Sequence, residues 1–253
     1  MLLIKKRQLR IAHLWYDDQP PARGVDLVVY NQAPTPHPGV DWVPKMTLVL
    51  DLAKTEEALF AEMKSSYRAK IRTAINKDHV LCKVDGAPDL AMRTEFCAFY
   101  DRFATAKGIS LLDRNLLEEM AHQGQLAIAM ARLEAQPMDE PLAIHAYLVY
   151  GGRVRLLHST SNRLGEHDAD RLNLIGRANR LLHWESVRWA REQGHTYYDF
   201  GGWYGGTTDS QRLAINQFKD GFGGTRITEY MAIQGVTLLG KLGVAFWKRL
   251  KGI

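Results

Sequence analysis

The pattern of apolar and polar positions predicts an antiparallel meander in the middle of the chain. Three runs rich in apolar and β-branched residues, separated by turn residues, predict strands at 125–134, 142–150 and 153–159. Gly151 and Gly152 lie between the last two runs and tolerate the positive φ that a tight hairpin needs.

Helices are predicted on both sides of this meander. Before it, an aromatic-rich helix ends near Lys107-Gly108 and a shorter one covers 115–122. After it, a polar loop at 161–173 leads into a long helix from about Ile175, which ends at Gly194. The remaining elements are a strand at 196–200, a short helix at 211–218, a strand at 225–232 and a final helix at 236–250.

The N-terminal part has a weaker pattern. Residues 1–45 are predicted to be irregular, because six prolines interrupt any long element. A strand follows at 46–52, and Thr55 is placed to cap a single helix that runs to about Lys77. A short strand is expected at 80–84.

This order of elements is typical of an α+β fold, with a mixed and largely antiparallel sheet flanked by helices. We expect three parts. Residues 1–88 form a partial N-terminal unit with a basic helix, 89–235 form a complete unit, and 236–253 form a C-terminal amphipathic helix.

Composition narrows the class of protein only slightly. The net charge of +5 and a pI near 9.1 favour anionic partners such as phosphates, nucleic acid or a lipid surface, and do not choose among them. No run of eighteen apolar residues occurs, so no membrane-spanning helix is expected. Cys82 and Cys97 fit no zinc or redox spacing. We therefore expect a cytoplasmic protein.

The segment Asn173-Leu-Ile-Gly176-Arg177-Ala178 resembles the acyl-CoA-binding turn of the GNAT superfamily. There, small residues let the backbone approach a pyrophosphate, and unpaired N–H groups at a helix start bind it. The resemblance implies that Asn173, Gly176, Arg177 and Ala178 bind the cofactor, with Arg177 adding a charge-assisted contact. Asn173 departs from the Gln or Arg of that family. The alternative is a plain capped helix whose small residues allow close packing.

A second resemblance extends over residues 46–232. The segments 178–185, 198–202 (Tyr-Asp-Phe-Gly-Gly) and 218–224 (Phe-Lys-Asp-Gly-Phe-Gly-Gly) resemble the FemA/FemB/FemX peptidoglycan-bridge transferases and their BioF2-like relatives. These families use a GNAT-like fold, usually in two copies. The resemblance implies one complete GNAT-like unit here, preceded by a partial one.

The families acylate amines on glycoconjugate precursors. Bridge enzymes use aminoacyl-tRNA as the acyl donor, and BioF2-like members use acyl-CoA. By resemblance, Phe218 and Lys219 form the pair beside the reacting ester, where Lys219 stabilises the oxyanion or the leaving group. The alternative is a surface Lys219 that pairs with Asp220 or solvent.

Acyl transfer also needs a carbonyl-polarising donor and a route for the amine proton. In GNAT folds a splayed central strand supplies the donor, which here places His158 and Ser159 beside the acyl group. Asp199 is a candidate to receive the proton or to hold the acceptor. It is equally placed to cap the Gly201-Gly202 turn.

The other candidate site residues also have a purely structural interpretation. Trp203 and Tyr204 are candidates to stack on a sugar or base, or they are half-buried packing residues. Arg68 and Arg72 lie four apart on one helix face and would hold acceptor or tRNA phosphates, or form a solvated basic face. The final helix carries an apolar stripe that would dock on the domain or lie on an anionic membrane.

The sequence therefore predicts an N-acyltransferase that moves an acyl group, most simply acetyl, from acyl-CoA to an amine on an amino sugar or cell-surface glycoconjugate precursor. Its acceptor would be a small or lipid-linked amino sugar, and no metal site is expected. One alternative is aminoacyl transfer from tRNA. The other is a non-enzymatic module that binds tRNA or the inner membrane surface.

Overall fold

The computed structural model describes residues 1–6, 8–21, 23–136 and 138–251, with side chains described up to residue 245. The chain forms two compact units. The first comprises Met1–Thr47, Asp113–Met120 and Arg226–Ile253, and the second comprises Leu48–Leu112 and Ala121–Thr225. The division expected at residues 88 and 235 stays a prediction about how the chain is organised into domains.

The first unit is built mainly on strands. Its elements are β1 (Leu2–Lys6), β2 (Leu9–Trp15), β3 (Leu27–Ala33), most of α4 (Arg114–His122), most of β10 (Thr225–Gly235) and α7 (Leu238–Lys251). Strand β1 is antiparallel to β2, β2 is parallel to β3, and β3 is antiparallel to β10. The expectation that residues 1–45 are irregular is therefore wrong. The prolines, Pro44 excepted, lie between these strands and shape the loops.

The second unit contains the predicted meander. Its elements are α1 (Glu56–Glu62), α2 (Ser65–Asn76), β5 (Val80–Asp85), α3 (Leu90–Lys107), β6 (Leu126–Leu133), β7 (Ala143–Tyr150), β8 (Arg153–Ser161), α5 (Ala169–Glu192), β9 (Tyr197–Trp203) and α6 (Ser210–Asp220). The strand order is β4-β9-β8-β7-β6-β5, where β4 (Val43–Asp51) begins in the first unit. The pairs from β5 to β8 are antiparallel and β8–β9 is parallel. The mixed, largely antiparallel α+β fold is confirmed.

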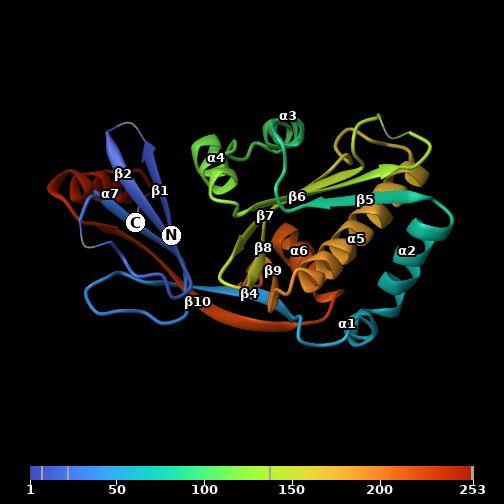
Figure 1. Cartoon of the computed structure of the whole chain (residues 1–253), viewed down its shortest axis with the longest axis horizontal. Coiled ribbons are helices and arrows are strands. Elements are labelled where there is room, and N and C mark those ends of the chain that lie inside the picture. Colours follow the sequence, from blue (N-terminus) through green and yellow to red (C-terminus); the bar gives the residue numbers. More distant parts are fainter. Residues whose placement is uncertain (7, 22, 137, 252–253) are drawn as a thin grey trace. The chain divides into compact units, whose positions relative to one another are not determined.

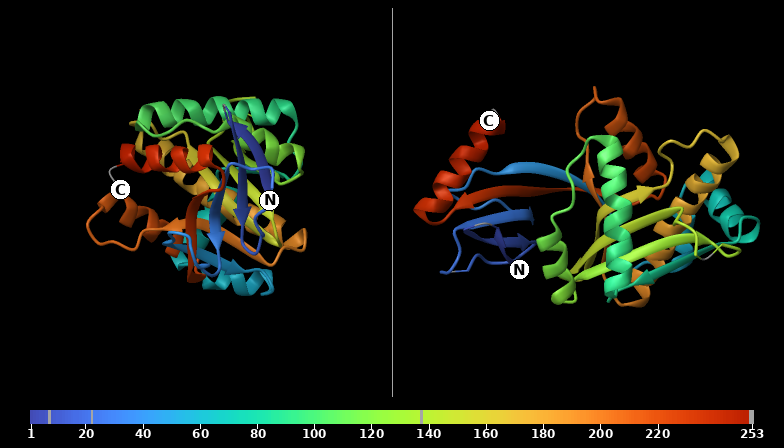
Figure 2. Two further views of the ribbon diagram at one scale, coloured as in Figure 1. Left: turned by 90° about the vertical axis from the view of Figure 1, so that its left-hand side faces the viewer. Right: turned by 90° about the horizontal axis from the view of Figure 1, so that it is seen from above.

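Helices cover both faces of this part of the sheet. Figure 1 shows α3 on one face of β5 and β6 and α5 on the opposite face. In the view from above, α3 lies across the meander strands (Figure 2, right). The apolar side of α5, with Leu181, Leu182 and Val187, is buried in the main core beside Tyr198 and Phe222. This burial holds α5 against the sheet and fixes the direction of its other side chains.

Glycine marks the turns as predicted. The hairpin residues Gly151 and Gly152 have φ of 56° and 74°, and Gly108 ends α3 at φ 63°. Gly194 follows α5 at φ 78°. Each of these values lies in the left-handed region that side chains rarely adopt.

Two predicted helix boundaries are wrong. The single helix expected from Thr55 is two helices, because the chain bends at Met63 and the N–H of Lys64 donates to the carbonyl of Gly221. The long helix begins at Ala169 rather than near Ile175. Its N-cap is Asp168, whose carboxylate accepts from the second and third helical N–H groups.

The final helix packs through its small residues. A Cβ at Gly240 would lie 1.8 Å from the carbonyl oxygen of Asp26, so only glycine fits there. Leu238, Leu239 and Leu242, from the predicted apolar stripe, are exposed. The side chains of Phe246 and Leu250 lie outside the described residues. No described helix has both the length and the apolar character needed to cross a membrane.

Candidate active site

A cavity of about 430 Å³ opens in the second unit, and residues of α3, β8, α5, β9 and α6 line it. Its lining residues are Phe103, Lys107, Leu156, Ser159, Ser161, Arg163, Gly176, Asn179, Arg180, His183, Phe200, Ala214, Ile215, Phe218 and Lys219. Four of them are basic and none is acidic. The cavity therefore favours an anionic ligand over a cationic one.

The cavity lies where β8 and β9 separate. Among the described residues, their parallel pairing runs only from Arg153 to Arg155 of β8, opposite Tyr197 to Asp199 of β9. Beyond that point, the N–H of Gly201 donates to the Asp199 carboxylate at 2.7 Å, and Gly201 takes a φ of 70°. This local turn lies where the pairing of β9 with β8 ends. The splayed central strand expected from the sequence is thus present.

A β-bulge then sets which side chains of β8 reach the cavity. Ala146 pairs with His158 while its neighbour Tyr147 pairs with Leu156, so Leu157 is an extra residue. The extra residue puts Leu156 and Ser159 on the same face, where both line the cavity. His158 points to the opposite face and packs against Tyr100 of α3, with ring centroids 4.6 Å apart. Of the predicted pair, only Ser159 reaches the cavity.

Lys219 is the most constrained charge of the cavity. Its side chain is only 8% exposed, and Nζ donates to the carbonyl oxygens of Gly202 at 2.6 Å and Gly201 at 3.3 Å. Burial lowers the pKa of this ammonium group to about 8, with Asp199 opposing the shift and Arg155 adding to it. Lys219 is thus a buried cation in the cavity wall, not a surface lysine.

Phe218 lines the cavity beside Lys219 and helps to order a cation. The guanidinium of Arg180 lies 5.1 Å from the Phe218 ring centroid and 4.5 Å from that of Tyr67. One of its nitrogens donates to the carbonyl of Gly176 at 2.6 Å. These contacts hold Arg180 in one orientation at the cavity wall.

A buried network behind the cavity was not foreseen as functional. The hydroxyl groups of Tyr147 and Tyr198 form a hydrogen bond of 3.1 Å. Each hydroxyl also lies within hydrogen-bonding distance of a histidine: His145 Nδ1 is 2.8 Å from that of Tyr147, and His183 Nδ1 is 2.9 Å from that of Tyr198. His145 reaches the amide oxygen of Asn179 at 2.7 Å. The one sequence signal was a histidine set between Leu182 and Trp184 on the apolar side of a helix.

Asp199 lies next to the cavity without lining it. It is fully buried, 3.4 Å from Arg153, and it holds the Gly201 N–H. The Tyr198 hydroxyl lies within hydrogen-bonding distance of His183 Nδ1, and the Phe200 ring packs against the His183 ring. Because successive side chains of a strand point to opposite faces, Asp199 points to the face of β9 away from His183. This geometry matches the turn-capping alternative, and a proton-accepting role stays a prediction.

The segment 173–178 lies inside α5 rather than at its start. Gly176 lines the cavity, Ala178 is buried in the core and Asn173 is exposed. Arg177 forms two hydrogen bonds with Asp78, at 2.5 and 2.9 Å. Helical N–H groups in this interior are used within the helix, so the anion-binding physics of a helix start does not apply to them. Their contact with a cofactor stays a prediction.

The predicted substrate-binding residues lie outside the cavity lining. Arg68 donates to the carbonyls of Ala61 and Met63 at the end of α1. The guanidinium of Arg72 lies over the ring of Phe60. Trp203 packs half-buried against the core. Tyr204 is held by Asn216, which accepts from its N–H and donates to its carbonyl. Their substrate contacts also stay predictions.

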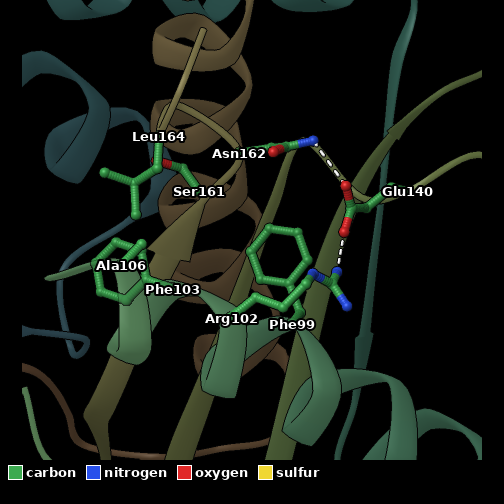
Figure 3. Close-up of a pocket in the computed structure, with 8 residues that line it drawn as sticks. All are labelled: Phe99, Arg102, Phe103, Ala106, Glu140, Ser161, Asn162 and Leu164. Carbon is green, nitrogen blue, oxygen red and sulfur yellow. Dashed lines mark hydrogen bonds and ion pairs between the residues drawn. The ribbon is translucent and has the colours of Figure 1, made fainter. Parts of the chain in front are cut away.

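A second pocket of about 210 Å³ shares Phe103 and Ser161 with the cavity. Figure 3 shows Phe99 and Phe103 on its floor and Glu140 between Arg102 and Asn162. Arg102 and Asn162 both donate to the Glu140 carboxylate, Asn162 at 3.0 Å. The carboxylate is therefore committed to neighbours within the fold. No group of three or more His, Cys, Asp or Glu side chains among the described residues is arranged to hold a metal ion.

Comparison with known proteins gives the family. The family model described as "Acetyltransferase (GNAT) domain" matches residues 61–219, which contain every residue that lines the cavity. The chain belongs to the GNAT acetyltransferase family. The match supports an acyltransferase over the non-enzymatic alternative.

Solved structures at 11–16% sequence identity share the fold of this chain. The structure of FemX matches with a TM-score of 0.56 and 16% identity, over 75% of this chain and 61% of FemX. L-PGS from Bacillus licheniformis matches at 0.50 and 15%, over 89% of this chain and 73% of that one. The C-terminal domain of a putative lysylphosphatidylglycerol synthetase from Agrobacterium fabrum matches at 0.53 and 11%, over 86% and 70%. No curated protein sequence matches significantly.

Proposed function

We propose that this GNAT protein transfers an aminoacyl group from a tRNA ester to an amine, with the chemistry at the Lys219 cavity. The main observation behind this proposal is the charge of that cavity. Its lining has no acidic residue and four basic ones: Lys107, Arg163, Arg180 and Lys219. The 3′ end of a charged tRNA brings phosphates next to the reacting ester. Basic walls would hold those phosphates while the ester enters the cavity.

Lys219 has the geometry for electrostatic catalysis. When an amine attacks the ester, negative charge develops on the carbonyl oxygen. A fixed ammonium group in a water-poor cavity stabilises that charge far more than it would in water. The two glycine carbonyls hold Nζ in place before the reaction, so little reorganisation is needed.

We prefer the tRNA donor because the segment 173–178 lies inside α5 and the start of that helix is capped by a carboxylate. The start of α5 carries Asp168 and Asp170, and Asp168 already accepts its free N–H groups. A pyrophosphate there would meet two carboxylates. The resemblance to bridge-forming transferases and the similar folds of FemX and L-PGS support aminoacyl transfer as the reaction.

Acetyl-CoA is the second candidate donor, with an amino sugar or a lipid-linked amino sugar as acceptor. The match to the acetyltransferase family model favours it. The same cavity would serve, with its basic residues on the CoA phosphates. Either donor implies work in the cytoplasm, and a lipid-linked acceptor would add contact with the inner membrane surface.

One assay decides between the donors. The protein is mixed with tRNA carrying a radiolabelled amino acid, or with acetyl-CoA, each with glucosamine as a simple amine acceptor. We expect the aminoacyl ester to be lost faster than in buffer, with label appearing in an amide. Lys219→Ala should slow this reaction by about 10²- to 10³-fold, whereas Lys70→Ala, at an exposed lysine of α2, should not. Consumption of acetyl-CoA alone would favour the second candidate, and no consumption of either would overturn both.

A further inference from the structure

His183 presents an unusual group beside the cavity. The residue lines the cavity, yet it is 1% exposed and surrounded by the rings of Phe200, Phe218 and Phe222. Its Nδ1 is committed to Tyr198, on the core side. Its Nε2 is buried and has no hydrogen-bond partner among the described residues. A buried nitrogen without a partner destabilises the fold unless a ligand or water completes it.

The hydrogen bonds behind His183 are consistent with a proton on Nδ1 of this ring. Ser186 donates its only hydroxyl proton to the carbonyl of Leu182 at 2.7 Å, so Tyr147 must donate to Ser186 at 2.9 Å. Tyr147 then has no proton left for Tyr198, and Tyr198 must donate to Tyr147. With the proton on Nδ1, His183 donates to the Tyr198 oxygen, and Nε2 carries a free lone pair.

The ring stays neutral in this environment. Burial lowers the pKa of His183 well below its usual value, and His145, Lys219 and Arg180 lower it further. Among the described residues, no donor forms a hydrogen bond with Nε2. The ring centroid of His145 lies 4.2 Å from that of His183, with the two rings tilted. A neutral imidazole with one bare nitrogen is a hydrogen-bond acceptor.

We propose that Nε2 of His183 accepts the N–H of the incoming amine and takes its proton during acyl transfer. This inference rests on the proposed function and adds a nucleophile site to it. It selects an acceptor that presents an uncharged primary amine, because the basic wall repels an ammonium group. His183 and Lys219 then divide the reaction between them.

The amine nitrogen attacks the ester carbon, a C–N bond forms, and the carbonyl π pair moves to oxygen near Lys219. The N–H proton passes to Nε2, the oxygen pair re-forms the carbonyl, and the C–O bond to the ribose breaks with its electrons on the ribose oxygen. The transient imidazolium, unfavourable beside three cationic or basic neighbours, returns that proton to the departing oxygen. An ester and an amine thus become an amide and an alcohol, with no other reactant.

Two matched variants separate this role from packing. In His183→Asn, the side-chain amide can take the place of Nδ1 as the donor to Tyr198, but nothing replaces Nε2. In His183→Gln, the amide oxygen can take the place of Nε2 as an acceptor that cannot be protonated. We expect His183→Asn to fold and to bind the donor as the wild type does. Its transfer rate to glucosamine should fall by about 10²- to 10⁴-fold, and that of His183→Gln nearly as far.

Hydroxylamine supplies the readout that packing would not move. It attacks esters with little need of a base, so His183→Asn should retain most of the wild-type rate with it. Equal losses with both amines, or no loss with glucosamine, would overturn the proposal. Wild-type protein that consumes neither aminoacyl-tRNA nor acetyl-CoA would instead overturn the proposed function.

A spectroscopic measurement tests the proton assignment without turnover. In protein labelled with ¹⁵N in its histidines, His183 should show a protonated Nδ1 and a bare Nε2, identified by the loss of its signals in His183→Asn. A protonated Nε2 would contradict the proposal directly.

Discussion

The ammonium group of Lys219 donates to the carbonyl oxygen of Gly202 at 2.6 Å, so the charge of the cavity is fixed by the backbone of β9. The turn that presents this carbonyl is held by the Asp199 carboxylate on the Gly201 N–H. Asp199 therefore acts on the cavity through the position of Lys219. A carboxylate with no contact to substrate can still decide whether the cation is in place.

Activity should fall as the pH rises through about 8, because catalysis needs Lys219 as an ammonium group and its pKa is lowered to about 8. Protein stability should move the other way over the same interval. The unfolded chain keeps the lysine proton to higher pH, so the free energy of unfolding rises between pH 8 and the unfolded pKa. A kcat/KM profile together with thermal melts distinguishes the two. Parallel loss of both would contradict the assignment.

Lys219→Ala should lower kcat by about 10²- to 10³-fold, the effect of removing one oxyanion-stabilising donor. Lys219→Arg should recover only part of this loss, since the guanidinium cannot occupy the ammonium position between two carbonyls. Lys70→Ala is the matched control. Wild-type kcat in Lys219→Ala would remove Lys219 from the mechanism.

Arg177→Ala should lower stability rather than donor affinity. It leaves the half-buried Asp78 carboxylate without its two hydrogen bonds, a loss of about 2 kcal/mol. For a chain of this size, that corresponds to a fall in Tm of about 4 to 8 °C. The double variant Arg177→Ala/Asp78→Ala should regain part of the loss. A weaker affinity for acetyl-CoA without a change in Tm would instead support the cofactor contact predicted from the sequence.

Arg163→Ala should weaken donor binding in a salt-dependent way. This exposed side chain lines the cavity, and it is one of the four cations available for donor phosphates. Loss of one phosphate contact on a single strand reduces the slope of log K against log salt by about 0.7. Binding of charged tRNA over a series of salt concentrations measures this slope, and an unchanged slope would exclude Arg163 from the donor site.

Substitution by alanine should lower stability at one glycine of the sequence motifs and leave it unchanged at another. Gly224 has φ 91°, and a Cβ there would lie 2.5 Å from the carbonyl oxygen of Val49, so Gly224→Ala should cost at least about 1–3 kcal/mol of stability. Gly202 has open space around its Cα. Gly202→Ala should fold normally, and its carbonyl should still hold Lys219. Thermal unfolding of the two variants gives the comparison.

The sequence predicted elements whose signals are local. The meander and α3 followed from apolar runs and from glycines that end them, and the Phe218-Lys219 pair followed from a family motif. The break between α1 and α2 could not be predicted in this way. It depends on the Gly221 carbonyl, which is distant in sequence and accepts the Lys64 N–H. No proline or glycine marks it.

The site shows the same limit. Lys219 could be named from its motif, but its burial depends on how β9 turns at Gly201. The role of His183 depends on the register of Tyr147 and Tyr198 on separate strands, relative to a helix. The start of α5 is set by the Asp168 cap, which lies before the glycine motif near Gly176 and makes the helix begin six residues before Ile175.

The extra residue Leu157 divides β8 into two parts that are constrained by different contacts. The part before it is tied to the core and to β9, so its sequence is constrained by folding. The part beyond it supplies Ser159 and Ser161 to the cavity, out of phase with the first. Substitutions at these two serines can therefore alter which donor or acceptor fits, while the hydrophobic phase of the strand is left intact. Within this enzyme, evolution of specificity and preservation of the fold can proceed on one strand independently.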